Sequence, residues 1–239
     1  RAFLDYTAAQ VSPLALQVIM EYQGILKRRN VLLERSARGG SPPDGIEAWD
    51  EALIAKGAEI VRLRRGMMRE VSLRAERLFG EILGVSSGFR MEYACSFGSA
   101  ESDPAEALRD CLGWTRVVER RRGFTMAGPH YDDVRIFLES AELRRFGSQG
   151  RKRLAALVLK LAQALTILEE RGERPVVILD DIFSELDRET ADRVRAHLGD
   201  SFQSFMTTPR PEEIGALPAG SARFFIEGGA IREAPGASC

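Results

Sequence analysis

The chain has 239 residues, of which 44% are hydrophobic and 29% are charged, a composition typical of a soluble globular protein. This length leaves room for one large domain or two small ones. The formal net charge of −1 argues against a chain that is covered on all sides by nucleic acid, although it leaves local basic patches open.

The cysteine content indicates a reducing cytosol. The three cysteines are far apart and form no C-x-x-C pair, so neither a zinc site nor a disulfide framework is indicated: Cys95, Cys111 and Cys239. No apolar run approaches the roughly 18 residues of a membrane span, and no signal peptide opens the chain. We therefore expect no membrane partner. Because the first residue is Arg1 and not Met, we also expect the chain to be part of a longer protein.

The first third of the chain predicts two long helices. Apolar residues recur every three or four positions from Val11 to Leu33 and again from Ile46 to Ile82, which is the period of amphipathic helices. The stretch ARGGSPPDG, Ala37 to Gly45, breaks the pattern and predicts a connection. The second helix would be about 57 Å long at roughly 1.5 Å per residue. We expect residues 1–85 to form a helical arm, an antiparallel hairpin; a plain helical subdomain is the alternative.

Residues 86–234 predict helices mixed with strands, which indicates an α/β fold. A long helix is expected from Arg151 to Glu170, then a strand, and then a helix that Asp187 caps and Gly199 ends. The remaining segments predict short elements, and residues 235–239 are expected to be disordered. These elements are a strand in Phe89–Phe97, a short helix capped near Asp103, a hairpin in RVVERRRGFTMAG, a short strand in IFLES, and two strands in QSFMTT and ARFFIEGGAIRE.

The stretch PVVILDDIFSELD, Pro175 to Asp187, places two carboxylates at the tip of an apolar strand that is expected to be fully buried. Buried charge is costly unless a cation or a donor compensates it. Asp180 could hold a hydrated Mg²⁺, which takes one or two carboxylates and keeps several waters. Asp181 could orient or deprotonate an attacking water. The alternative is that both acids begin a turn, with Ser184 and Asp187 capping the next helix.

The stretch FGSQGRKR, Phe146 to Arg153, stands directly before the long helix. A Gly-Ser-Gln-Gly turn at a helix amino terminus leaves backbone N–H groups unpaired, and the helix dipole favours an anion there. Ser148 adds a hydroxyl donor, and the three basic residues that follow Gly150 add positive charge. The alternative is that Ser148 only caps the helix.

The remaining candidate groups are weaker. The basic runs ERRRG and RLRRGMMR could meet DNA phosphates, but such runs are more often solvated faces. We expect His130 and His197 to be structural. We expect Trp49 and Trp114 to be packing residues and not base-stacking platforms.

The order of the two main motifs resembles the carboxy-terminal half of an SMC/ABC-type ATPase head, in which a signature turn precedes a helix, a Walker B strand and a D-loop. The segments ILDDIFSELD, GSQGRKRLAALVLKLAQ, GPHYDD, LKRRNVLL and WDEALIAKGAEIVRLR together are similar to the RecF family. The resemblance implies a P-loop NTPase-like sheet in residues 86–234, with the helical arm attached to it.

The resemblance also implies roles for particular residues. Asp180 would be the Walker B ligand of Mg²⁺, and Asp181 would stand where the water-activating acid stands. The signature motif would contact the γ-phosphate of ATP bound to a second subunit through Ser148, Gln149 and Gly150. The dimer interface would include Ser184 and Asp187 of the D-loop, and Thr207 would occupy the switch position.

Membership of this family would imply an ATP-dependent DNA-binding protein of recombinational repair, replication and the SOS response. An ATP-gated homodimer would bind single-stranded, gapped and double-stranded DNA and help mediator proteins to load recombinase. Two other classes remain open, namely the ATPase subunit of an ABC transporter and a non-catalytic dimerising module. The long helical hairpin, the SELD sequence and a threonine in place of the transporter histidine at Thr207 argue against a transporter.

We predict that this chain alone hydrolyses no ATP, although the intact protein would be a weak DNA-dependent ATPase. No G-x-x-x-x-G-K-[ST] loop occurs between Arg1 and Cys239, so nothing in the chain cradles the β- and γ-phosphates. In the RecF family this loop lies near the amino terminus, ahead of the matching region. A phosphate-release assay on the purified chain checks the prediction, and turnover that disappears in Asp181→Asn would contradict it.

Overall fold

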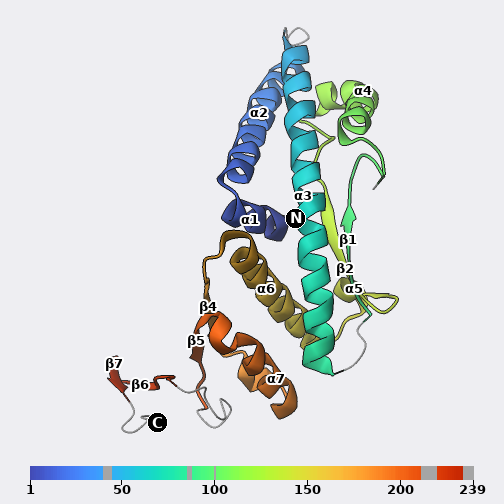
Figure 1. Cartoon of the computed structure of the whole chain (residues 1–239). Helices are drawn as coiled ribbons and strands as arrows, with labels where there is room; N and C mark the ends of the chain where they lie inside the picture. Colours follow the sequence, from blue (N-terminus) through green and yellow to red (C-terminus); the bar gives the residue numbers. More distant parts are fainter. Residues whose placement is uncertain (40–44, 85–87, 100, 211–219, 234–239) are drawn as a thin grey trace. The chain divides into compact units, whose positions relative to one another are not determined.

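The computed structural model describes residues 1–39, 45–84, 88–99, 101–210 and 220–233. The chain forms two compact units, Arg1–Glu173 (unit 1) and Arg174–Cys239 (unit 2). Unit 1 contains α1 (Ala2–Val11), α2 (Pro13–Ala37), α3 (Ile46–Leu83), β1 (Phe89–Ala94), α4 (Pro104–Arg122), β2 (Asp133–Leu138), β3 (Ala141–Glu142), α5 (Leu143–Phe146) and α6 (Gln149–Arg171). Unit 2 contains β4 (Val176–Asp180), the 3-10 turn η1 (Phe183–Glu185), α7 (Arg188–Leu198), η2 (Gly199–Ser201), β5 (Gln203–Thr207), β6 (Phe224–Glu227) and β7 (Ala230–Glu233) (Figure 1).

The first expected helix, Val11 to Leu33, corresponds to α2, and a further helix, α1, precedes it. Ser12 is extended, with φ −138° and ψ 122°, and Pro13 is the first residue of α2. Proline is favoured at that position because its fixed φ suits a helix and its missing N–H would have no helical partner there. The prediction that began this helix at Val11 was wrong at this end, and it missed α1.

The unbroken 38-residue α3 confirms the second predicted helix. It lies antiparallel to α2, and α1, α4, α6 and β1 also pack against it (Figure 1). Gly57 allows the close approach of α4, since a Cβ atom there would lie 2.7 Å from a methyl group of Leu108. One hydrophobic cluster joins the hairpin to α4 and to the segment after it: Tyr22, Leu53, Ile54, Ile60, Leu108, Leu112 and Ala127.

Helix α4 is longer than expected. Asp103 caps it as predicted, accepting hydrogen bonds from the N–H groups of Ala105 and Glu106 at 2.9 and 3.1 Å. The helix then continues to Arg122 and ends at Gly123, whose φ of 78° is left-handed. The hairpin predicted for RVVERRRGFTMAG was therefore wrong, because the side chain of Glu119 is drawn into the interior by a buried ion pair that keeps this stretch helical.

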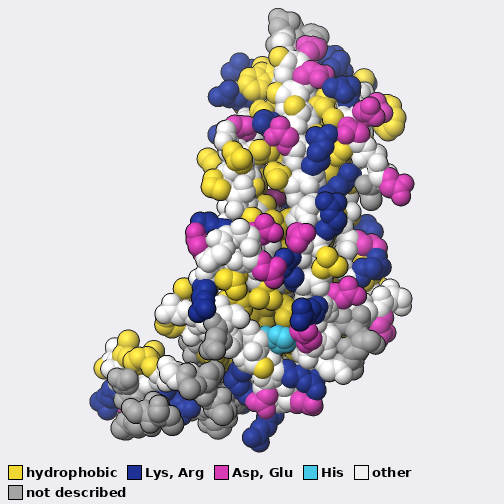
Figure 2. Space-filling view, in the orientation of Figure 1, with side chains coloured by type: hydrophobic (Ala, Val, Ile, Leu, Met, Phe, Trp, Pro, Cys, Tyr) yellow, Lys and Arg dark blue, Asp and Glu magenta, His cyan; other side chains and the backbone are white. Residues whose placement is uncertain are grey.

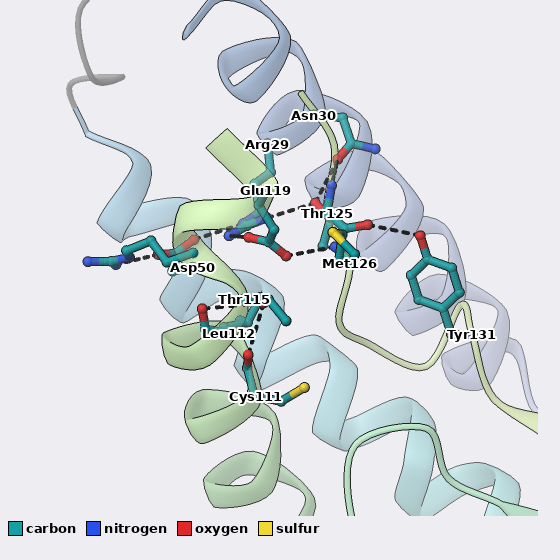
Figure 3. Close-up of polar contacts among 11 residues, drawn as sticks. Arg29, Asn30, Asp50, Cys111, Leu112, Thr115, Glu119, Thr125, Met126 and Tyr131 are labelled. Atoms are coloured by element: carbon teal, nitrogen blue, oxygen red, sulfur yellow. Dashed lines mark hydrogen bonds and ion pairs between the residues drawn. The ribbon is translucent and has the colours of Figure 1, made fainter. Parts of the chain in front are cut away.

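That ion pair belongs to a network around the fully buried Arg29 of α2 (Figure 3). The Nε of Arg29 donates to Asp50 of α3 at 2.8 Å, Nη2 donates to Glu119 of α4 at 2.7 Å, and Nη1 donates to the hydroxyl of Thr125 at 2.8 Å. The other carboxylate oxygen of Glu119 accepts the N–H of Met126 at 2.7 Å. One guanidinium therefore fixes three helices and the segment that follows α4.

A second buried arginine, Arg64 of α3, ties α1 and the GPHYDD loop to the hairpin. Its Nε and Nη2 form a bidentate pair with Asp5 at 2.7 and 2.8 Å, and its Nη1 donates to the carbonyl of Pro129 at 2.6 Å. In the same loop, Nδ1 of His130 lies 2.6 Å from the hydroxyl of Tyr22, and burial lowers the pKa of His130. These contacts agree with a structural role for this histidine.

The basic run RLRRGMMR makes contacts inside unit 1. Arg62 pairs with Asp103 at 2.9 Å, Arg64 is buried as described, and Arg65 donates to the carbonyl of Ser99 at 2.8 Å. On the visible face of unit 1, basic and acidic side chains alternate and do not gather in one basic field (Figure 2). That pattern is typical of a solvated surface.

The sheets of the described residues are small. In unit 1, β1 pairs antiparallel with β2, and β2 pairs with β3; the predicted strand IFLES lies partly in β2. In unit 2, β4 and β5 are the two strands predicted before and after α7, and they pair in parallel. The strands β6 and β7 form an antiparallel hairpin where one strand was expected. Residues 235–239 lie outside the described residues.

The compact units divide between Glu173 and Arg174, whereas the sequence predicted a domain boundary between residues 85 and 86. Helix α3 packs against both α4 and α6 within unit 1. The assignment of an arm and a head to separate ranges stays a prediction. None of the helices in the described residues is both long enough and apolar enough to cross a lipid bilayer.

We predict that Glu119→Ala destabilises unit 1 by about 3–5 kcal/mol, because it leaves the Arg29 charge buried without its partner. Urea unfolding followed by far-UV circular dichroism measures this. The control is Glu51→Ala, which removes a solvent-exposed pair with Arg109 and should cost far less, because water screens that pair. Equal effects of the two substitutions would contradict the assignment.

Candidate functional site

The glycine-serine turn lies at the start of α6 in unit 1. Gly147 is the first residue of the turn. A Cβ atom at that position would lie 2.6 Å from the carbonyl oxygen of Leu143, so the turn requires glycine there. Ser148 is the N-cap, and its Oγ accepts the N–H of Arg151 at 3.4 Å. Ser148 therefore does cap the helix, which was the alternative to a ligand-binding role. Ser148, Gln149 and Gly150 are all exposed, so the cap leaves the turn open to a ligand.

The charge at this helix start is unusual. The first turn of α6 contains no acidic residue, and Arg151, Lys152 and Arg153 follow Gly150. Basic residues near a helix amino terminus oppose the helix dipole, which favours negative charge there. The start of α6 therefore combines a positive dipole end with positive side chains, an arrangement that suits an anion with several negative oxygens.

The acidic pair lies at the carboxyl end of β4 in unit 2. The parallel register places Asp180 opposite Thr207 of β5, and the Thr207 hydroxyl donates a hydrogen bond to Oδ1 of Asp180. Asp180 is exposed, and Oδ2 forms no hydrogen bond within the described part of the chain. The sequence did not predict this threonine–aspartate contact, because it depends on the pairing register of two strands that α7 separates.

Asp181 leaves the strand in a left-handed conformation, with φ 49°. Its N–H donates to the Thr207 carbonyl at 3.1 Å, and its own carbonyl accepts the hydroxyl of Ser184 at 2.9 Å. A non-glycine residue with positive φ stores strain, and such residues gather at functional sites. No sequence signal marks this conformation, since Asp-Asp does not require it.

The structure brings Asp180, Asp181, Ser184 and Thr207 together at one end of the β4–β5 pair. Asp187 lies at the start of α7, which it caps by accepting the N–H and the hydroxyl of Thr190 at 2.9 and 2.7 Å. The signature residues Ser148, Gln149 and Gly150 belong to the other compact unit. The functional roles of all eight residues stay predictions.

The apolar part of β4 is not fully buried within this chain, contrary to the prediction. Leu179 is buried, but Val176 and Ile178 on the opposite face are 54% and 70% exposed. The described part of unit 2 has a two-stranded sheet here, and alternate residues of a strand face opposite sides of its sheet.

The carboxylates suit a magnesium site that is completed by water and phosphate better than a metal site whose ligands all come from the protein. The described residues contain no group of three or more His, Cys, Asp or Glu side chains that could enclose a metal ion. Mg²⁺ needs one or two carboxylates and completes its shell with water and phosphate oxygens. Asp180, with one carboxylate oxygen without a hydrogen bond, meets that requirement.

No protein-family model matches the chain. A solved structure described as the recombination mediator protein RecF with ATPrS superposes with a TM-score of 0.83 at 28% identity, covering 98% of this chain and 62% of that one. A RecF–ATP structure gives the same values. The fold is therefore that of an ABC/SMC-type ATPase head, in an α/β chain with a helical hairpin.

Comparison with curated protein sequences narrows this class to one family. The chain is 35% identical over 213 residues to "DNA replication and repair protein RecF" of Halothermothrix orenii, covering 87% of this chain and 57% of that protein. It is 32% identical over 236 residues to the protein of the same name from Alkaliphilus oremlandii, covering 97% and 64%. The chain is a homologue of the RecF proteins, and it spans less than two thirds of the length of these two relatives.

We predict that the cap of α7 contributes stability only above acid pH. The hydrogen bonds from Thr190 hold the pKa of Asp187 below its usual range. Because the folded-state pKa is lowered, this contribution is present above the unfolded pKa of about 3.9 and is lost as the pH falls through the folded value. Asp187→Ala should therefore lower the urea midpoint of unit 2 at pH 7, and the difference should shrink in acid. Asp187→Asn, which keeps an acceptor that does not titrate, is the control. A difference that stays constant with pH would contradict this.

Proposed function

We propose that this chain is the signature, Walker B and D-loop part of a RecF-like, ATP-dependent DNA-binding protein of recombinational repair, replication and the SOS response. The observation that carries the proposal is the constellation at the end of β4. There, an exposed carboxylate held by the Thr207 hydroxyl stands beside a second carboxylate on a strained residue. A plain turn does not require the contact between the Thr207 hydroxyl and Asp180.

The acidic pair divides the chemistry between two carboxylates. Asp180 is the residue that would hold Mg²⁺, and the ion, when bound, neutralises charge on the phosphate oxygens. Asp181 would accept a hydrogen bond from the attacking water at its carboxylate and take its proton, as the water bonds to the γ-phosphorus and the bond from that phosphorus to the oxygen of the departing ADP breaks. Its left-handed backbone turns this side chain out of the regular alternation of β4.

Dimerisation completes the site in this proposal. Ser148, Gln149 and Gly150 meet the γ-phosphate of ATP bound to a second subunit, and the basic, acid-free start of α6 supports that assignment. Ser184 and Asp187 lie in the dimer interface, and Thr207 occupies the switch position. The phosphate loop comes from a segment that precedes the matched region in the longer RecF relatives.

ATP binding would close the dimer around single-stranded, gapped or junction DNA, and hydrolysis would reopen it. Mediator proteins would then load recombinase at the same DNA. The proposal includes a cytoplasmic location and no membrane partner.

The test is a chimera in which the preceding segment of the Halothermothrix orenii relative is fused ahead of Arg1. We expect it to bind gapped DNA in the presence of ATP and to hydrolyse ATP slowly. Asp181→Asn should lower turnover at least about 100-fold while ATP-dependent dimerisation and DNA binding persist. Ser148→Arg should abolish ATP-dependent dimerisation, because it fills the open turn of α6.

The matched control is Gln23→Arg, which adds the same charge at an exposed position of α2 and should change neither property. A chimera that folds but binds gapped DNA equally with and without ATP would refute the proposal. So would full dimerisation by the Ser148 variant, which is the result that a non-catalytic dimerising module predicts. Co-purification with a membrane permease would instead favour a transporter ATPase.

A further inference from the structure

Helix α4 presents a set of large apolar side chains to solvent that unit 1 leaves uncovered. Trp114 is 82% exposed and Val117 is 63% exposed. We had expected Trp114 to be a packing residue, and that expectation was wrong within the described structure. A tryptophan buries 150–250 Å² when it is covered, so an exposed one forgoes a large stabilisation.

The fully buried large side chains of α4 lie on its opposite face. Leu108, Leu112 and Glu119 are buried against α2 and α3. Figure 1 shows α4 beside one end of the long α3. The uncovered side chains recur at spacings of four, three and four residues, which is the period of a helix–helix seam. We call this seam the α4 outer stripe: Asp110, Trp114, Val117 and Arg121.

The two charges of the stripe stand at its two ends, on either side of the apolar pair. Arg121 follows Asp110 by eleven positions, close to three helical turns, so both residues lie on the same side of α4, about 17 Å apart along its axis. Neither side chain has an ion pair within the described part of the chain. The stripe is thus acidic at one end, apolar in the middle and basic at the other.

We propose that the α4 outer stripe is a docking surface for a second copy of this chain, with the two α4 helices antiparallel about a two-fold axis. An isologous contact requires a surface that complements itself. With the axis passing between residues 115 and 116, Asp110 of each copy faces Arg121 of the other, and Trp114 faces Val117. One axis position gives both pairs, because the two residues of each pair lie equally far along the helix from the point between residues 115 and 116.

The stripe fits a second copy better than nucleic acid. Arg120, Arg121 and Arg122 would attract phosphates. However, Asp110 in the same stripe repels them, and the valine of the stripe offers neither a stacking face nor a hydrogen bond. A single-strand site instead combines a basic groove with several aromatic rings.

One helix pair covers less than the roughly 1,200 Å² of a standard stable interface. The association is therefore weak, and it needs no nucleotide, which separates it from the ATP-gated dimer of the proposed function.

The first experiment measures self-association of this chain without ATP and with EDTA. Sedimentation equilibrium from about 1 to about 500 μM, a span chosen for weak complexes, should show a monomer–dimer equilibrium. The protein has two tryptophans, so Trp49→Phe leaves Trp114 as the reporter. Its emission should shift to shorter wavelength over the same concentration range as the ring is covered.

Charge reversal then tests the geometry. Asp110→Arg and Arg121→Asp should each weaken the dimer at least tenfold, because each places like charges together twice. The double variant Asp110→Arg/Arg121→Asp should return to within about threefold of the parent. Arg35→Asp is the matched control, since it reverses another exposed arginine in the last turn of a helix and should change nothing.

A chain that stays monomeric over the whole range would overturn the proposal, as would a double variant that associates no better than the single ones. Quenching of Trp114 by an oligothymidylate without self-association would identify nucleic acid as the occupant instead, and would also overturn it. None of these results bears on ATP-dependent DNA binding by the chimera.

Discussion

The buried guanidinium of Arg29 is the group on which the packing of unit 1 depends. A desolvated arginine must have its donors paired, and here the partners come from α3, α4 and the segment after α4. Hydrophobic packing alone would allow these elements to shift relative to one another. The guanidinium can donate to all its partners only when the elements take one relative position. The same pairing holds the second half of α4 helical and so turns Trp114 and its neighbours outward.

Arg64, thirty-five positions further along the chain, is a second buried arginine whose donors are paired with groups from other segments. It joins α1 and the GPHYDD loop to the middle of α3, so the long helix serves as the common support of unit 1. Helix α6 packs on the same support, and Arg74 of α3 pairs with Glu169 of α6. The turn at Ser148 therefore stands on a rigid helix, and a phosphate-binding turn needs such a base to hold its N–H groups in place.

Unit 2 shows how strain and exposure accompany the acidic pair. Asp181 is held left-handed by the Thr207 carbonyl on one side and the Ser184 hydroxyl on the other, and the outward face of β4 remains uncovered within this chain. The left-handed backbone costs stability, and the exposed face forgoes the stabilisation that burial would give. In the proposed function, the left-handed Asp181 would belong to the ATP site, and the exposed face of β4 would contact the rest of the protein.

The sequence by itself determined the features that depend on neighbouring residues. The apolar period specified α3 and α6, Asp103, Ser148 and Asp187 specified three caps, and the order of the glycine-serine turn and the acidic strand indicated the ATPase class. Only the tertiary structure decided the extent of α4, the left-handed Asp181, the Asp180–Thr207 contact and the exposure of Trp114 and Ile178. The physical reason is that periods and caps are set within one or two helical turns, whereas burial, strand register and ion pairs join residues far apart in the chain.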